Sequence, residues 1–146
     1  MLSQTTEYAL RAVVWLAGHT KGPLTTSEIA RATQSPAGYL SKVMKDLADA
    51  GIVAAQRGKN GGFTLAKPAR DLTILEVVEA VDPIRRIHEC PLGRKAHGKA
   101  LCPLHRRLDD ALRITEQAFR DTRIAELCEP EIGSGDRCRT LEASYV

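Results

Sequence analysis

Hydrophobic residues in the first half of the chain recur every three or four positions, which is the spacing of amphipathic helices. The clearest run lies just before Gly51 and places four apolar side chains on one face: Leu40, Val43, Met44 and Leu47. Ser35 suits the capping position of this helix, and Pro36 suits its first helical position because no N–H is needed there. Gly51 suits the left-handed conformation that ends many helices. We therefore predict a helix over residues 36–50 with one buried stripe.

A shorter helix is predicted directly before it. Thr25 and Glu28 have the Thr-x-x-Glu spacing of a capping box, and apolar residues follow as far as Ala32. Residues 33–34 then leave room only for a tight turn. The order of a capped helix, a tight turn and a second helix is typical of a helix-turn-helix unit.

Two β-like runs follow this unit, at residues 52–56 and 62–66. The turn between them contains glycines and an asparagine, which tolerate positive φ, and it carries Arg57 and Lys59. A basic hairpin behind a helix with a polar, basic face predicts a winged helix. In that arrangement the helix enters a major groove and the hairpin, called the wing here, lies along phosphates.

Two more helices are expected to complete the core around this unit. Residues 5–18 form the first, with an inner face of Leu10, Val13, Val14 and Ala17. Thr73 caps the second, which runs to Val81 and packs through Leu75, Val77, Val78 and Val81. Asp82-Pro83 ends it.

A long helix is predicted from Pro103, with Cys102 in the capping position. Its apolar stripe consists of Leu104, Leu108, Ala111, Leu112, Thr115, Phe119 and Thr122. A stripe of about five turns beyond a compact core indicates packing against a partner chain. A symmetric homodimer suits a two-fold DNA site. Residues 124–128 extend this part by a further helical turn or two.

The chain therefore divides into four parts, and the fold class is mainly α. Residues 1–82 form the winged helix-turn-helix domain, 83–102 a cysteine-containing loop, 103–128 the dimerisation helix with a following short helix, and 129–146 a polar, mobile tail.

Charge is distributed unevenly over the 146 residues, whose net charge is +3. Residues 1–70 carry +5 and the remainder −2. The basic half is the half with the helix-turn-helix pattern, so we expect double-stranded DNA as the partner there. No apolar run is long enough to span a bilayer and no leader pattern follows Met1, so we expect a cytoplasmic protein without a membrane partner.

The expected DNA contacts share two properties: polar or basic side chains, and positions on the helix-turn-helix surface or the wing. They are Ser27, Ser35, Tyr39, Lys42, Lys45, Arg57, Lys59 and Asn60. Lysines on this surface argue against a winged helix that binds only protein, because protein interfaces are depleted of lysine.

The four cysteines are the remaining chemical signal. In a reducing compartment they indicate metal, cluster or redox chemistry rather than a disulfide framework. Cys90 and Cys102 lie in or beside a loop that also contains His97, and His105 follows in the first turn of the long helix. We expect Cys128 to be a small buried residue and Cys138 an exposed thiol of the tail.

At this point the chain resembles the Rrf-two (Rrf2) family of bacterial winged-helix regulators. The matching pieces are residues 7–12, Tyr39-Leu40, residues 47–51, the wing motif Arg57-Gly58-x-x-Gly61-Gly62-Phe63-x-Leu65 and the cysteine-containing loop. The resemblance covers about residues 1–125. It implies a homodimeric, sequence-specific regulator with a long crossed dimerisation helix and a sensing site in the loop before that helix.

The resemblance also implies a ligand set for an iron–sulfur cluster, with one departure. Cys90 and Cys102 have the spacing of the outer two of three family cysteines, and His105 matches an additional histidine ligand. The middle position is Ala96, which cannot ligate. His97 and Glu7 compete for the open place, since an acidic residue of the partner's first helix ligates in some relatives. Two cysteines and two histidines are adequate for a [2Fe–2S] centre.

Other interpretations remain open. Cysteine and histidine in a polar loop also bind zinc, and a cofactor-free thiol switch would use the cysteines alone. Glu7 lies four residues before Arg11, so an exposed ion pair is the simpler role for both. A small thiol- or metal-dependent enzyme is the rival from another class. No phosphate-binding loop, paired catalytic carboxylates or nucleophile motif supports it.

Overall fold

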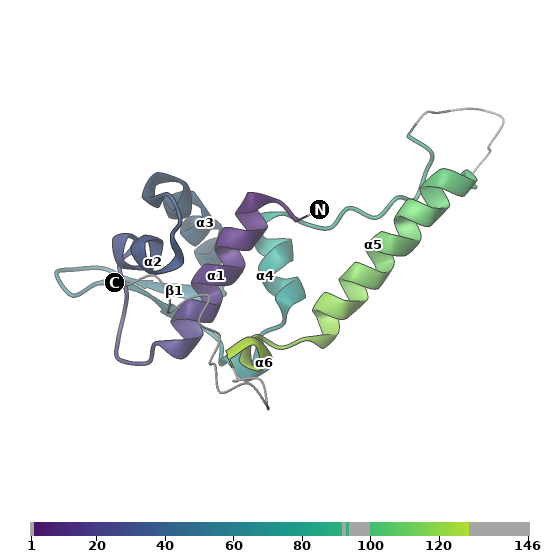
Figure 1. The fold of residues 1–146 in the computed structure, drawn as a ribbon. Coiled ribbons are helices and arrows are strands. Elements are labelled where there is room, and N and C mark those ends of the chain that lie inside the picture. Colours follow the sequence, from purple (N-terminus) through teal and green to yellow (C-terminus); the bar gives the residue numbers. More distant parts are fainter. Residues whose placement is uncertain (1, 92, 94–99, 129–146) are drawn as a thin grey trace.

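Helix α1 (Gln4–Gly18) lies at the centre of the computed structural model, which describes residues 2–91, 93 and 100–128 (Figure 1). Around it lie the helix-turn-helix pair, the wing, a 3₁₀ turn and two short helices, while the longest helix extends outwards. These elements are α2 (Thr26–Thr33), α3 (Ala37–Asp49), β1 (Val53–Gln56), β2 (Gly62–Leu65), η1 (Ala69–Asp71), α4 (Ile74–Val81), α5 (Pro103–Asp121) and α6 (Ile124–Cys128).

The buried face of α1 is rotated from the predicted one. Of the four expected inner residues only Val13 is buried, and it is accompanied by Thr6, Ala9, Ala12 and Leu16. Small side chains at Ala9 and Ala12 allow α1 to approach its neighbours closely, since α1 contacts α2, α3, α4 and α6. Leu10, Val14 and Ala17 lie at the edge of this core and are only partly covered.

The helix-turn-helix unit forms as predicted, with one exception. Thr25 and Glu28 make a complete capping box on α2, and Gln34 adopts the left-handed turn conformation with φ of 54°. Ser35 was predicted as the cap of α3, and this prediction is wrong. Pro36 occupies the cap position without a side-chain hydrogen bond, because the buried Ser35 hydroxyl contacts the hydroxyl of Thr33 at 2.9 Å.

The buried stripe of α3 matches the prediction: Leu40, Val43, Met44 and Leu47. Gly51 follows the helix with φ of 71°, as expected.

The predicted wing is an antiparallel hairpin in which Val53 pairs with Leu65 and Gln56 with Gly62. A third piece of backbone joins it, because the N–H groups of Leu24 and Phe63 each donate to the other's carbonyl, at 3.0 and 2.7 Å. Gly62 is required here. Its φ is +153°, and a Cβ at this position would lie 2.5 Å from the Leu24 backbone. The hairpin is thereby fixed to the segment that leads into α2.

Helix α4 begins at the predicted cap Thr73, which forms a complete capping box with Glu76. It buries Ile74, Val77 and Val78, so Ile74 replaces the expected Leu75, which is half-buried. Between the wing and α4, residues 67–68 lead into the 3₁₀ turn η1.

Helix α5 has no buried residue, and it extends away from the core (Figure 1). The chain then returns: Ile124 of α6 is fully buried in the core, and its N–H donates to the carbonyl of Leu72 at 2.8 Å. Within the described part of the chain, no helix is long and apolar enough to cross a bilayer.

Candidate functional site

The expected DNA-contacting side chains lie on α2, on α3 and at the tip of the wing. With the exception of Ser35, whose side chain is buried, all of them are exposed. The exposed residues are Ser27, Tyr39, Lys42, Lys45, Arg57, Lys59 and Asn60. Basic and polar side chains therefore lie on the exposed faces of α2 and α3 and at the tip of the wing.

Two of these residues have partners that sequence analysis did not reveal. Tyr39 is 44% exposed, and its hydroxyl is hydrogen-bonded to the hydroxyl of Thr5. Its ring packs edge-on against the ring of Tyr8, with 5.7 Å between the ring centroids. Lys45 forms a hydrogen-bonded ion pair with Asp49 at 2.5 Å, and this bond raises the pKa of Lys45. Tyr39 thus connects α3 to the start of α1, and Asp49 competes with any phosphate for Lys45.

Glu7 forms the predicted ion pair with Arg11. Arg11 also donates to the carbonyl of Thr33 at 3.3 Å, at the turn between α2 and α3. Arg11 therefore links the Glu7 carboxylate to the turn between α2 and α3.

Cys90, Cys102 and His105 lie together at the start of α5. His105 Nδ1 is 3.7 Å from Cys90 Sγ and 3.1 Å from Cys102 Sγ. All three ligand atoms lie within 4.8 Å of one another, and each residue is partly buried. Of the five predicted ligands, these three are the ones that the structure brings together.

The other two predicted ligands, His97 and Glu7, are not seen at the cluster for different reasons. His97 lies outside the described residues; the tail residue Cys138 does too. Glu7 belongs to α1 and is not part of the cluster within one chain. Cys128 was expected to be buried, which is wrong: it is exposed at the end of α6, with Sγ 3.3 Å from the Ile124 carbonyl oxygen.

Helix geometry explains why Cys102 and His105 meet. Cys102 is the N-cap of α5, as predicted, and Pro103 occupies its first turn. Side chains at the N-cap and three residues later lie face to face, which is the basis of the capping box. Thr25 and Glu28 use this spacing for hydrogen bonds, whereas Cys102 makes no capping bond and its thiol contacts the imidazole instead.

The donor set fits a metal centre. In a tetrahedral site with metal–sulfur and metal–nitrogen bonds near 2.3 and 2.0 Å, sulfur and nitrogen are separated by about 3.5 Å. The two sulfur–nitrogen distances, 3.1 and 3.7 Å, lie on either side of this value. Thiolate and imidazole also ligate iron–sulfur clusters. Three donor side chains are thus spaced as the ligands of one metal centre would be.

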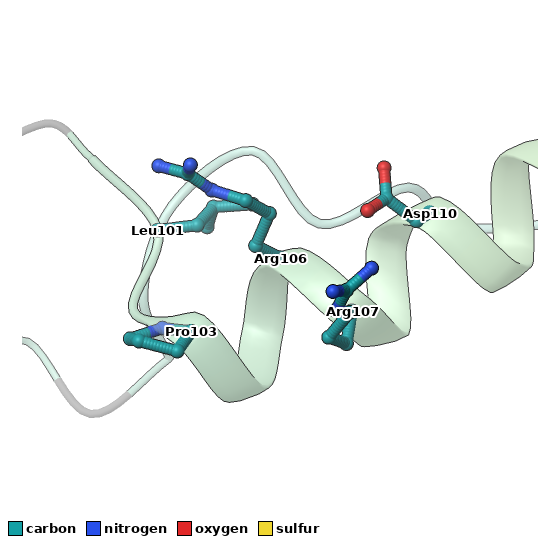
Figure 2. A pocket seen from close by; sticks show the side chains of 5 residues that line it. All are labelled: Leu101, Pro103, Arg106, Arg107 and Asp110. Atoms are coloured by element: carbon teal, nitrogen blue, oxygen red, sulfur yellow. The ribbon is translucent and has the colours of Figure 1, made fainter.

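A hollow of about 400 Å³ lies beside this turn of α5 (Figure 2). Its lining combines two arginines with an acidic and two apolar residues: Leu101, Pro103, Arg106, Arg107 and Asp110. None of the three clustered donors lines it, so the hollow and the donor cluster are separate features of the same turn.

Solved structures share this fold. The cysteine regulator CymR (YrzC) of B. subtilis superposes with a TM-score of 0.70 and 21% identity, covering 87% of this chain and 95% of CymR. IscR of T. potens gives a TM-score of 0.71 and 20% identity, covering 87% of this chain and 85% of IscR. The fold is therefore a mainly helical winged helix-turn-helix with a two-stranded wing.

Sequence comparison goes further. The rrf2-like HTH-type transcriptional regulator of Rhodobacter capsulatus is 38% identical over 86 residues, which are 56% of this chain and 57% of that relative. The chain thus spans little more than half the length of this relative. The profile of the Rrf2 family, described as iron-dependent transcriptional regulator, matches residues 2–130. The chain belongs to the Rrf2 family of transcriptional regulators, a family of DNA-binding proteins rather than enzymes.

Proposed function

We propose that this protein is a homodimeric, sequence-specific regulator whose operator binding responds to an iron–sulfur cluster held by Cys90, Cys102 and His105. The observation that carries the proposal is the gathering of these three donors within 4.8 Å at the first turn of α5. The protein would act in the cytoplasm and report redox state, iron supply or nitric oxide.

The DNA-binding part rests on exposure and charge. Tyr39 and Lys42 on α3 would face the major groove, and Arg57 and Lys59 on the wing would lie along phosphates. Ser27, Lys45 and Asn60 are exposed at the borders of this surface. We place Ser35 at its edge as a backbone contact only, because its hydroxyl is buried.

The dimer would form along α5. Leu104 is 63% and Leu108 47% exposed in the single chain. Exposed leucines one helical turn apart are the pattern that a second helix covers. A two-fold axis through α5 would present two winged helices to a palindromic operator.

A [2Fe–2S] cluster would contribute a centre whose state changes on oxidation, iron loss or reaction with nitric oxide. Cys90 and Cys102 would ligate it as thiolates, and His105 would ligate through Nδ1, the nitrogen that faces both sulfurs. The fourth ligand would be His97 of the same chain or Glu7 of the second copy. Glu7 would then leave Arg11, the residue that contacts the helix-turn-helix turn.

The start of α5 is connected to the DNA-binding core through the other end of the same helix. The N–H of Ile74 donates to the Thr122 carbonyl at 3.1 Å, and Ile124 is fully buried in the core. Because α5 is one continuous helix of 19 residues, a shift at Cys102 would be passed along it to these contacts.

A single zinc ion is the second candidate, favoured by the compactness of the donor set. Donor atoms within 4.8 Å of one another suit one tetrahedral ion. Zinc has no redox chemistry, so a zinc protein would bind its operator equally well before and after oxidant treatment, unless the thiolates themselves react.

The test begins with an operator selected from a random DNA pool by the cluster-loaded, anaerobic protein. We then measure the affinity of loaded and cluster-stripped protein for this operator at one salt concentration. We expect a difference between 5- and 150-fold, the usual range of coupling between two sites. Cys128→Ser is the matched cysteine control and should retain the difference. Equal affinities of loaded and stripped protein would contradict the proposal.

A further inference from the structure

Arg86 and Asp109 form a two-pronged ion pair that joins the loop after α4 to helix α5. Arg86 Nε donates to Asp109 Oδ1 at 2.6 Å, and Arg86 Nη2 donates to Oδ2 at 2.7 Å. The backbone N–H of Ile87 donates to Oδ1 at 2.9 Å. The side chains are 25% and 15% exposed, so this contact, called the clamp here, is shielded from much of the solvent.

The clamp lies where the Cys90 segment needs support. Residues 83–91 form neither helix nor strand. The Cys90 carbonyl accepts from the Gly93 N–H at 3.0 Å, a bond within the same loop that does not tie Cys90 to α5. Arg86 precedes Cys90 by four residues, and Asp109 follows His105 by four, one turn further along α5. The clamp therefore fixes the loop to α5 four residues away from both Cys90 and His105, whose Sγ and Nδ1 atoms are in contact.

We propose that Arg86 and Asp109 are positioning residues for the metal site, holding the Cys90 thiol beside Cys102 and His105 before any metal binds. This inference rests on the proposed function only in requiring that the three donors bind a metal. Cys102 and His105 belong to one helix and meet without help, whereas Cys90 must be brought to them.

The chemistry of the pair suits this role. A bidentate bond between guanidinium and carboxylate fixes orientation as well as distance, which a lysine cannot reproduce. Glu116 adds a second carboxylate, 3.5 Å from Arg86 Nη1. The hydrogen bonds from Arg86 hold the pKa of Asp109 well below its usual range, so the pair stays charged at every pH of interest.

The test is a titration of the reduced, metal-free protein with Co²⁺, whose sulfur-to-metal absorption reports the bound thiolates. Asp109→Asn and Arg86→Gln should weaken Co²⁺ binding by about 10- to 100-fold, the usual effect of removing groups that orient ligands. The absorption per bound ion should also fall as Cys90 disengages, a signature that a general loss of stability would not produce. The exchanged pair Arg86→Asp/Asp109→Arg should recover part of the affinity.

Asp110→Asn is the matched control, because Asp110 neighbours Asp109 but lines the hollow instead. It should bind Co²⁺ like the wild type. Arg86→Lys keeps the charge without the planar fork, and it serves if Asp109→Asn does not fold. Clamp variants with wild-type affinity and absorption would overturn the inference. A wild type that binds no Co²⁺ would instead contradict the metal site itself.

Discussion

The Sγ atom of Cys102 lies 3.1 Å from Nδ1 of His105 across the first turn of α5. Two other helices of this chain, α2 and α4, begin with a threonine and a glutamate at the same spacing. The spacing that begins two helices with a capping box thus brings a thiol and an imidazole together at the start of a third. Rigid helix geometry therefore defines two of the three donors, and only Cys90 depends on a loop.

The wing should contribute affinity without sequence preference. In the variant Arg57→Ala/Lys59→Ala, two exposed cations at the wing tip are lost. Because phosphate contacts release counterions, the plot of log affinity against log salt should become shallower by about one unit per lost contact, equally for operator and unrelated DNA. Fluorescence anisotropy at several salt concentrations measures this. An unchanged slope and affinity would contradict the assignment of the wing.

Helix α5 should determine the oligomeric state. Leu108→Glu/Leu112→Glu places two charges in the stripe that includes the exposed Leu104 and Leu108. Burying unpaired carboxylates at a helix pair is strongly unfavourable, so the variant should be monomeric or aggregated and bind half-sites weakly. Arg113→Glu, an exposed change on the same helix outside the stripe, should leave the dimer intact. Sedimentation velocity distinguishes these outcomes, and a dimeric double variant would place the interface elsewhere.

Ionisation of Glu76 should make the free energy of unfolding depend on pH in the acidic range. Its pKa is lowered from 4.5, first by the hydrogen bond from Lys67, at 2.7 Å, and also by the Thr73 cap. A carboxyl with a lowered folded-state pKa stabilises the protein fully above its unfolded value, and this stabilisation is lost as the pH falls through the folded value. Glu76→Gln should therefore be less stable than wild type at pH 7.

The difference in free energy of unfolding between wild type and Glu76→Gln should become smaller as the pH approaches 3. Glutamine still accepts the capping bond, so only the charge is tested. Urea unfolding at pH 7 and pH 3 measures it, with Lys67→Gln as the partner variant. A difference that is the same at both pH values would show that the charge of Glu76 contributes nothing.

Local signals made most of the fold predictable. Capping boxes, the turn at Gln34 and the glycine after α3 act through neighbouring residues, and each is found where the sequence placed it. The errors arise where tertiary packing decides. The face of α1 depends on which neighbours approach it, and hydrophobic periodicity favours the larger Leu10 and Val14 over the small Ala9 and Ala12 that are buried.

The site was predictable only in part, for a similar reason. Cys102 and His105 are near in sequence, and spacing alone brings them together. Arg86 and Asp109 are 23 residues apart in a chain with many charges, and no local pattern distinguishes this pair. The same holds for the contact of Arg11 with the Thr33 carbonyl, 22 residues away.

The most direct test of the central claim is a count of iron and acid-labile sulfide per chain after anaerobic reconstitution of wild type, Cys90→Ala, Cys102→Ala and Cys128→Ser. We expect Cys128→Ser to take up as much iron and sulfide per chain as wild type, because thiolate ligands at the site hold such clusters. Both proteins should show the absorption of a [2Fe–2S] centre. Both variants at the site should bind neither. A wild type without iron, or a Cys102→Ala protein that retains as much as wild type, would contradict the account.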